Sequence, residues 1–389
     1  MGGFVLPVAR IQESLREARL DGWLLYDFRG SNPAARELLG LAAARTSRRF
    51  FVWIGASGPV RILHHAIEPG PLARLEGERI AYARWASLDA GLARVLRGAS
   101  RIAMEYVPGG VTPYGAYVDG GTLERVRSFG VEVVSSADLI QALTCAWSDA
   151  QREWHGRAVE GVQRARDAGL AALRPGVRET EVQAVIGHAL AASGLVTGHG
   201  ANVSFGPNAA NPHYDPAPGS DRALEEPQVV LFDIVGKVDH PLAPFADITW
   251  MSWHHGGPPE DVMRVWAAVS AARDLAVRTV RDAWRDRGGL AAWEVDRAAQ
   301  DHLIAAGFGE FLLHRTGHNL GHDHVHGQGA HLDDFETRDL RRLVARTAFT
   351  IEPGVYVPGR FGVRSEINVF LAEGGPEVTT DVQEELTLV

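Results

Sequence analysis

Residues 314–327 read H-R-T-G-H-N-L-G-H-D-H-V-H-G, so five histidines fall within thirteen residues. Imidazole is the commonest nitrogen ligand for metals in proteins, and it also carries protons near neutral pH. Two aspartates precede this segment and two glutamates follow it, each in an apolar or glycine-flanked stretch: Asp233, Asp247, Glu352 and Glu366. One histidine together with these four carboxylates makes a carboxylate-rich set of metal ligands.

This ligand set favours hydrolytic metal chemistry. Carboxylates are hard oxygen ligands and imidazole is borderline, so the set suits manganese, cobalt, iron or zinc. Four carboxylates cannot lie close together unless cations neutralise them. Two divalent ions would leave the site near neutral, and two ions can share one hydroxide while they polarise a carbonyl. The sequence therefore predicts a site with two divalent metal ions.

The order Asp, Asp, His, Glu, Glu resembles that of the pita-bread metallopeptidases, which include methionine aminopeptidase, aminopeptidase P, prolidase and creatinase. The flanking motifs are similar to those of the proline-directed branch. They are N-P-H-Y at residues 211–214, H-x-x-G-H at 314–318, T-I-E-P-G at 350–354 and G-V-R-x-E at 362–366. The resemblance covers residues 149–389.

The resemblance implies a role for each ligand. Asp233 would chelate one metal, whereas His318 and Glu352 would hold the other. Asp247 and Glu366 would bridge both, and Glu352 would also act as the general base. A pita-bread domain whose ligands have decayed would be a non-enzymatic binding module, but this chain retains all five.

Further catalytic and substrate-binding residues follow from the same resemblance. His213 would lie on the substrate side, and His314 would contact the residues after the scissile bond. His326 would stabilise the tetrahedral intermediate by donating a hydrogen bond to the developing oxyanion, with His324 as a competitor. Arg364, in G-V-R-x-E, is expected among the catalytic residues.

The chain also departs from the family pattern. Fourteen residues separate Asp233 from Asp247, which is longer than usual, and Trp250 replaces an expected arginine. These departures indicate an insertion in the hairpin between the two aspartate strands. The interval from His318 to His326 is eight residues, one more than usual.

We expect an Xaa-Pro dipeptidase that acts on short peptides with proline at the second position. A dipeptidase must bind the free carboxylate of the proline, and a guanidinium does so through two hydrogen bonds. Arg338, fourteen residues before Glu352, is the candidate clamp, and Arg341 and Arg342 lie close to it. If that arginine-rich loop is merely solvated, the alternative is an aminopeptidase P that accepts longer peptides.

Length and composition are typical of a globular chain of two domains, with 389 residues, 46% hydrophobic residues and a net charge of −9. No apolar run is long enough for a membrane span, and the first residues do not resemble a signal peptide. The single Cys145 favours a reducing compartment, so we expect a cytoplasmic protein. No basic stripe interleaved with aromatic residues indicates nucleic-acid binding.

Hydrophobic periodicity predicts two α/β domains that position these residues. Residues 1–148 alternate helices and strands and resemble the smaller amino-terminal domain of creatinase. The expected helices there are 8–22 and 87–96, and the expected strands are 23–26, 49–54, 60–65, 101–105 and 131–134. In relatives this domain often leans over the active site of a partner, so the resemblance implies a homodimer.

Residues 149–389 show two helices, strands, two helices and strands, the order expected of a pita-bread catalytic domain. The expected helices are 152–173, 179–192, 258–287 and 291–306. The expected strands are 203–206, 229–235, 348–352, 362–371 and 384–389. The loop at 207–227 is rich in proline, asparagine and aspartate.

Overall fold

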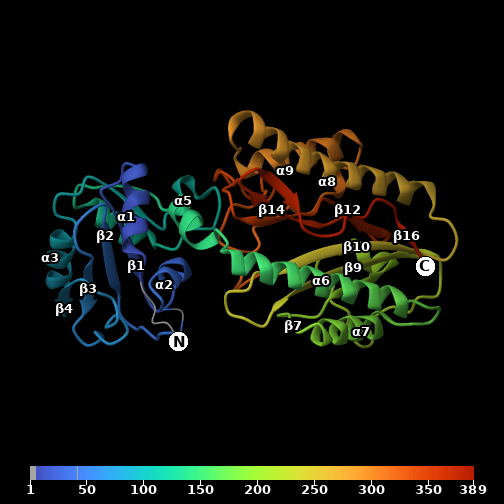
Figure 1. Cartoon of the computed structure of the whole chain (residues 1–389), viewed down its shortest axis with the longest axis horizontal. Helices are drawn as coiled ribbons and strands as arrows, with labels where there is room; N and C mark the ends of the chain where they lie inside the picture. The colour runs from blue at the N-terminus through green and yellow to red at the C-terminus, as the bar shows by residue number, and fades with distance from the viewer. Residues whose placement is uncertain (1–5, 42) are drawn as a thin grey trace. The chain divides into compact units, whose positions relative to one another are not determined.

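The computed structural model describes residues 6–41 and 43–389. The chain divides into two compact units, of which one ends at Thr144 and the other begins at Cys145. The sequence places the domain boundary after residue 148. Both units contain helices and strands (Figure 1), which confirms the predicted α/β class.

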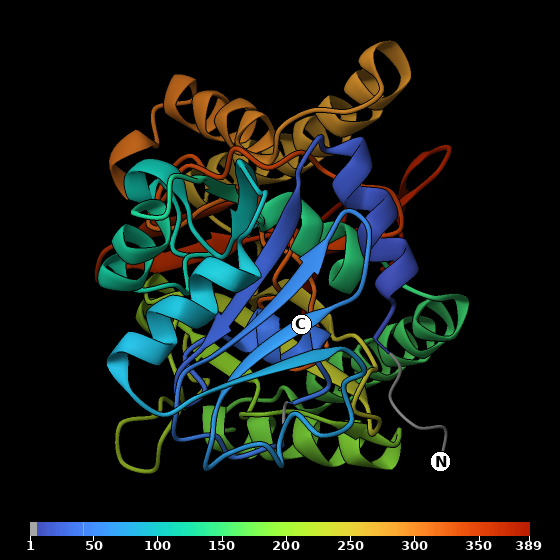
Figure 2. The same ribbon diagram turned by 90° about the vertical axis from the view of Figure 1, so that its left-hand side faces the viewer.

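The amino-terminal unit is a six-stranded sheet of order β4-β3-β2-β1-β5-β6 with helices on both faces. Figure 2 shows its strands with α1 in dark blue and α3 in cyan. The strands are β1 (Gly22–Asp27), β2 (Phe50–Gly55), β3 (Arg61–His65), β4 (Glu78–Tyr82), β5 (Arg101–Met104) and β6 (Glu132–Ser135). The helices are α1 (Val8–Glu17), α2 (Pro33–Leu38), α3 (Trp85–Val95), α4 (Gly120–Arg127) and α5 (Ala137–Ile140).

Successive side chains of β1 enter two different cores, because neighbouring residues of a strand point to opposite faces. Trp23 and Leu25 pack with Ile11 of α1, whereas Leu24 packs with Leu92 of α3. Four elements of this unit, β4, α2, α4 and α5, were not predicted. In β4 only Ile80 and Tyr82 are buried, which is a short apolar pattern, and α4 begins with two glycines, which are poor helix formers.

The carboxy-terminal unit has the predicted order of two helices, strands, two helices and strands. Its helices are α6 (Asp149–Ala172), α7 (Glu179–Ala192), α8 (Glu260–Arg287) and α9 (Ala292–Ala305). The strands of its first half are β7 (Leu195–Val196), β8 (Asn202–Phe205), β9 (Gln228–Val238) and β10 (Ala246–His254). Those of its second half are β11 (Ala348–Ile351), β12 (Gly354–Val357), β13 (Phe361–Arg364), β14 (Ile367–Ala372), β15 (Gly375–Val378) and β16 (Thr387–Leu388).

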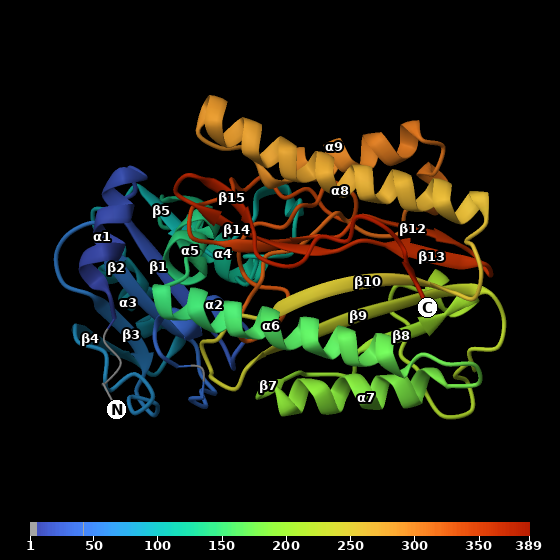
Figure 3. The same ribbon diagram turned by 45° about the vertical axis from the view of Figure 1, so that its right-hand side comes forward.

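Figure 3 shows the strands of this unit between α6 and α7 on one side and α8 and α9 on the other. Val162 of α6 and Ile186 of α7 pack against Phe232 of β9, while Val269 of α8 packs with Val363 of β13. The stretch predicted as one strand at 362–371 is two strands, because the chain leaves regular pairing at residues 365–366. In the described part of the chain, no helix combines the length and apolarity of a membrane span.

His155 of α6 is a buried histidine that ties this helix to both halves of the unit. Its Nδ1 donates to the carbonyl of Phe245 at 3.0 Å, so its Nε2 accepts from the Thr379 hydroxyl at 2.9 Å. Burial lowers the pKa of His155 to about 4, from an ordinary value of 6.5. Between these values the unfolded chain binds a proton that the folded chain excludes, so stability falls as the pH falls.

We therefore expect His155→Asn to flatten part of the pH dependence of unfolding. Between pH 7.5 and pH 5, wild type should lose about 2 kcal/mol more than the variant in free energy of unfolding. Urea titrations of the full chain at both pH values measure this difference. The exposed His188 of α7 provides the control, and His188→Asn should keep the wild-type slope. Equal slopes in wild type and His155→Asn would contradict the assignment.

Candidate metal centre

The two aspartates lie on one face of the β9–β10 hairpin. In this antiparallel pair Asp233 is opposite Thr249, and Asp247 is opposite Val235. Residues opposite each other share a face, and so do residues two apart along a strand. Asp233, Asp247 and Thr249 therefore point to the same side, although fourteen residues separate the aspartates. The connection at residues 239–245 contains the extra length.

The two glutamates lie opposite each other at the end of a second antiparallel pair. Strand β11 pairs with β14 in the register Thr350–Asn368 and Ile351–Ile367, and Glu352 and Glu366 come next. The Thr350 hydroxyl donates to Glu352 Oε1 at 2.9 Å. On the other side of Glu366, the fully buried Arg273 of α8 donates to the Ser365 hydroxyl at 2.8 Å. These contacts fix the backbone on which the carboxylates stand.

His318 reaches the same face because residues 316–320 run alongside β11. The Thr350 N–H donates to the His318 carbonyl at 2.8 Å, and the His318 N–H donates to the Thr350 hydroxyl oxygen at 3.0 Å. His318 Nδ1 lies 3.1 Å from the Asn319 carbonyl, so this nitrogen carries the proton. Its Nε2 lone pair then points to the carboxylates, 3.7 Å from Asp247 Oδ2 and 3.5 Å from Glu352 Oε1.

Asp247, His318 and Glu366 form a buried cluster whose ligand atoms all lie within 4.8 Å of one another. Within the described residues, Asp247 Oδ1 and Glu366 Oε1 are buried and accept no hydrogen bond. Burial raises the pKa of Asp247 to about 6, and burial beside Asp247 raises the pKa of Glu366 well above its ordinary value. A buried carboxylate oxygen without a donor is costly, and a bound cation would remove that cost. The residues present therefore fit a divalent metal.

Asp233 lies at the edge of this cluster. Its Oδ2 accepts from the Arg364 guanidinium, and Arg364 Nε also donates to the Thr249 hydroxyl oxygen at 2.7 Å. The Thr249 hydroxyl donates in turn to Glu366 Oε2 at 2.7 Å. Arg364 and Thr249 thus connect Asp233 on one hairpin to Glu366 on the other.

A cavity of about 400 Å³ opens over the cluster. The four carboxylates, His318 and Arg364 line it, together with His199, Gly200, Asn202, residues 212–215, Val235 and residues 324–326. The predicted substrate-side His213 and both candidate oxyanion histidines thus face the same space as the predicted ligands. The His326 ring centroid is 4.2 Å from that of His318, and the His324 centroid is 6.5 Å from that of His326.

Two predicted substrate-binding residues lie elsewhere. Among the described residues, those that line the cavity do not include His314 or Arg338. His314 Nε2 lies 2.7 Å from the Tyr356 hydroxyl, and its Nδ1 lies 2.7 Å from the Arg315 carbonyl. Arg338 is half exposed, pairs with Asp334 at 2.5 Å and stacks on the Trp293 ring. Their roles at the substrate stay predictions.

Several residues that hold the site together were not predicted from the sequence. Thr249 and Thr350 each lie two positions along the chain from a predicted ligand, and Thr249 and Asn202 each lie opposite Asp233. The motifs D-I-T and T-I-E contain two of them, and the spacing of two residues in a strand is the signal that predicts a shared face. Asn202 pairs with Asp233 from β8, a register that the sequence does not reveal.

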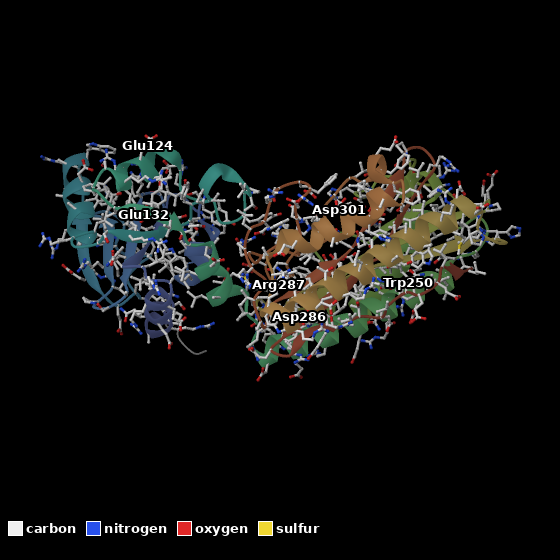
Figure 4. The ribbon with its side chains drawn as sticks, turned by 90° about the horizontal axis from the view of Figure 1, so that it is seen from above. Glu124, Glu132, Trp250, Asp286, Arg287 and Asp301 are labelled. Carbon is white, nitrogen blue, oxygen red and sulfur yellow. The ribbon has the colours of Figure 1, made fainter. Side chains whose placement is uncertain are left out.

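Trp250 stands where an arginine is expected and is labelled in Figure 4. Its side chain points to the opposite face of β10 from that of Thr249. Its indole N–H donates to the Thr387 hydroxyl oxygen at 2.9 Å, and the Arg166 guanidinium lies 4.1 Å from the ring centroid. The side chain is therefore used in packing between α6 and β16.

The two segments with unusual spacing, between Asp233 and Asp247 and between His318 and His326, lie next to each other. At the end of the β9–β10 connection, the Phe245 N–H donates to the Gly321 carbonyl at 3.0 Å. Two residues before that connection, Lys237 Nζ of β9 donates to the His322 carbonyl. The longer hairpin and the longer histidine segment, residues 319–325, are thus in direct contact.

The description "Metallopeptidase family M24" belongs to the family profile that matches residues 153–373. The chain is similar to the probable dipeptidase PepE of Mycobacterium tuberculosis, with 31% identity over 270 residues, which are 69% of this chain and 67% of that protein. The crystal structure of dipeptidase PepE from Mycobacterium ulcerans has a TM-score of 0.73 and 27% identity, and covers 98% of this chain and 96% of its own.

Two further structures share the fold at lower identity. The X-Pro aminopeptidase from Thermotoga maritima has a TM-score of 0.63 and 22% identity over 98% of this chain and 99% of its own. The recombinant prolidase from Thermococcus sibiricus has a TM-score of 0.65 and 23% identity over 100% of both chains. The comparisons confirm the predicted fold, a pita-bread unit preceded by a smaller α/β unit.

Proposed function

Because this chain belongs to metallopeptidase family M24, we propose that it is a two-metal dipeptidase that cleaves the bond before proline. The buried cluster of Asp247, His318 and Glu366, with its two carboxylate oxygens that lack donors, is the observation that carries this proposal. The dipeptidases and prolidase named above support the substrate class. Short peptides also suit a cavity of about 400 Å³.

Five residues would hold the two ions, with Asp233 on one ion, His318 and Glu352 on the other, and Asp247 and Glu366 between them. Bound divalent ions would polarise the scissile carbonyl and lower the pKa of a water nucleophile. Manganese, zinc and cobalt all suit such ligands. Glu352, which accepts from Thr350 and faces the cavity, would take the proton from the attacking water.

The remaining residues would bind and orient the peptide. His326 would donate an N–H to the carbonyl oxygen as negative charge develops there. Burial beside His318 and Arg315 lowers the pKa of His326 to about 3, so its ring donates as a neutral imidazole. His213 would contact the substrate at the cavity mouth, with His314 on the side of the proline. Arg364 would keep Asp233 oriented through their ion pair.

The proposal is tested with Ala-Pro, Ala-Ala, Ala-Pro-Ala and Met-Ala-Ser in the presence of manganese or of a chelator. Ala-Pro should be cleaved fastest, and only with metal. Cleavage of Ala-Ala at the same rate would remove the proline preference but leave a dipeptidase. Undiminished turnover in chelator, after verified removal of metal, would contradict the metal-dependent mechanism.

Cleavage of longer Xaa-Pro peptides is the alternative. One observation favours it, because Arg338 pairs with Asp334 and does not line the cavity. If Arg338 nevertheless binds the proline carboxylate when substrate enters, Arg338→Ala should lower kcat/KM for Ala-Pro about tenfold or more. The same variant should leave Ala-Pro-amide unaffected.

Steady-state kinetics of both substrates with wild type, Arg338→Ala and Arg342→Ala measure this discrimination. Equal cleavage of Ala-Pro and its amide by wild type would favour the aminopeptidase. If Arg342→Ala alone loses the preference for Ala-Pro over Ala-Pro-amide, the contact with the proline carboxylate belongs to Arg342.

We also propose a homodimer, on the basis of the family resemblance. Light scattering of the purified chain should then give twice its mass of 42.1 kDa. A monomer at micromolar concentration would contradict this proposal.

A further inference from the structure

One wall of the cavity consists of residues 212–215, within the long connection between β8 and β9. Apart from a short 3-10 helix, η3 (Gly206–Ala210), and isolated bridges, this connection has no regular backbone pairing. A segment without such pairing keeps one conformation only if other contacts fix it. The contacts that fix this wall converge on Glu179.

Glu179 is the first residue of α7 and is fully buried. Its Oε1 accepts from the Phe205 N–H at 2.6 Å, and both of its oxygens lie 3.0 Å from Asn208 Nδ2. Its Oε2 accepts from the Tyr214 hydroxyl and from the Arg222 N–H, each at 2.7 Å. One carboxylate therefore binds the start, the middle and the end of the connection.

The residues beside Glu179 bind the same segment. Asp221 accepts from the Arg178 guanidinium at 2.8 Å and from the Thr180 hydroxyl at 2.7 Å. Three consecutive residues at the start of α7 thus hold residues 221–222. A carboxylate at the amino-terminal end of a helix is also stabilised by the helix dipole.

His213 lies between two fixed neighbours. On one side, the Pro212 carbonyl accepts from Asn202 Nδ2 at 3.3 Å, and Asn202 pairs with Asp233 across β8 and β9. On the other side, the Tyr214 hydroxyl binds Glu179. His213 itself has an exposed side chain at the cavity.

Resting on the proposed peptidase function, we propose that Glu179 is a positioning residue for substrate binding, because its carboxylate fixes the wall that presents His213. It acts through the wall and does not itself line the cavity, as far as the described residues show. The effect of losing it should therefore fall on KM more than on kcat. The short helix η3 also packs closely on β13, which carries Arg364. A Cβ atom at Gly362 would lie 1.9 Å from the Ala209 carbonyl oxygen.

Glu179→Gln is the sharpest test, because it keeps the shape and removes the charge. The amide nitrogen faces other donors in either orientation, namely Phe205 and Asn208 at Oε1 or Tyr214 and Arg222 at Oε2, so the connection loses at least one hydrogen bond. We expect KM for Ala-Pro to rise about tenfold, with kcat within about threefold of wild type. The control is Glu181→Gln, an exposed glutamate in the same helical turn whose carboxylate accepts from the Arg178 N–H. It should leave both constants unchanged.

A second measurement needs no catalysis. Chymotrypsin cleaves after Tyr214 only when the wall leaves its site, so cleavage should be faster in Glu179→Gln than in Glu181→Gln. Asn208→Ala removes a wall-side contact without altering α7 and should change cleavage and KM in the same direction, by less. Metal content and thermal midpoint, measured on the same samples, show whether the metal site and the fold of the carboxy-terminal unit are intact in each variant.

The outcomes separate the two proposals. If wild type hydrolyses no peptide, the proposed function fails, and the proteolysis alone decides whether Glu179 fixes the wall. If Glu179→Gln matches Glu181→Gln in both KM and proteolysis, the positioning role is wrong. A fall in kcat, metal content and thermal midpoint with KM unchanged would make Glu179 a general structural residue and would also overturn it.

Discussion

Glu366→Ala protein is expected to bind fewer metal ions than wild type and to lose peptidase activity about a thousandfold or more. Glu366 contributes a buried carboxylate to the cluster with Asp247 and His318, and Thr249 of the other hairpin donates a hydrogen bond to it. Without that carboxylate, an ion between the hairpins loses a charged ligand. Metal analysis of purified protein and Ala-Pro turnover measure the two effects.

The exposed Glu373, at the turn after β14, provides the control. Glu373→Ala should keep both metal and turnover. A Glu366→Ala protein with wild-type metal content and full activity would exclude Glu366 as a ligand.

The isosteric variant Glu366→Gln should not destabilise the fold of the metal-free protein, although it should weaken metal binding. In chelator, its thermal midpoint should equal or exceed that of wild type, because the variant removes a buried carboxylate beside Asp247 whose Oε1 accepts no hydrogen bond among the described residues. Added manganese should then raise the midpoint of wild type and leave that of the variant nearly unchanged.

His326→Ala is expected to lower kcat about a hundredfold, with little change in KM or in metal content. The His326 ring lies 4.2 Å from that of His318, so it is the cavity histidine next to a predicted ligand. A donor at that place interacts with charge that develops during the reaction, and the ground state gains little from it. Steady-state kinetics with Ala-Pro measure kcat and KM separately and so test this prediction.

His324→Ala is the matched control, since His324 lines the same cavity two residues away. It should lower kcat less than tenfold. If His324→Ala has the larger effect on kcat, the oxyanion role belongs to that histidine, and the resemblance misassigns the pair because of the extra residue after His318.

Regular strands explain how much of the site could be predicted. Side chains in a strand alternate between faces, so a carboxylate in an apolar run predicts both a strand and a functional face. Asp247 follows this rule within β10, and Glu366 comes directly before β14 of the other hairpin, so the two carboxylates meet. The pairing of Asn202 with Asp233 could not be predicted in the same way, because register across a long connection depends on tertiary packing.

Irregular segments explain the rest. Counting fourteen residues back from Glu352 reaches Arg338, but a count along a loop gives no direction for the side chain. In the structure that guanidinium forms an ion pair with Asp334, four residues earlier. Likewise, Glu179 looks like an ordinary helix start in sequence, and only the folded connection brings five contacts to its carboxylate.

The contact between the β9–β10 connection and the histidine segment has an evolutionary consequence. The Phe245 N–H donates to the Gly321 carbonyl and Lys237 donates to the His322 carbonyl. The longer connection and the longer histidine segment therefore satisfy hydrogen bonds of each other. A lineage that shortened one of them alone would leave the carbonyls of two partly buried residues without these donors, whereas a lineage that shortened both would not. The two insertions should therefore have been gained together and should show epistasis. Searches that fix the gap between motifs will overlook chains that carry the pair.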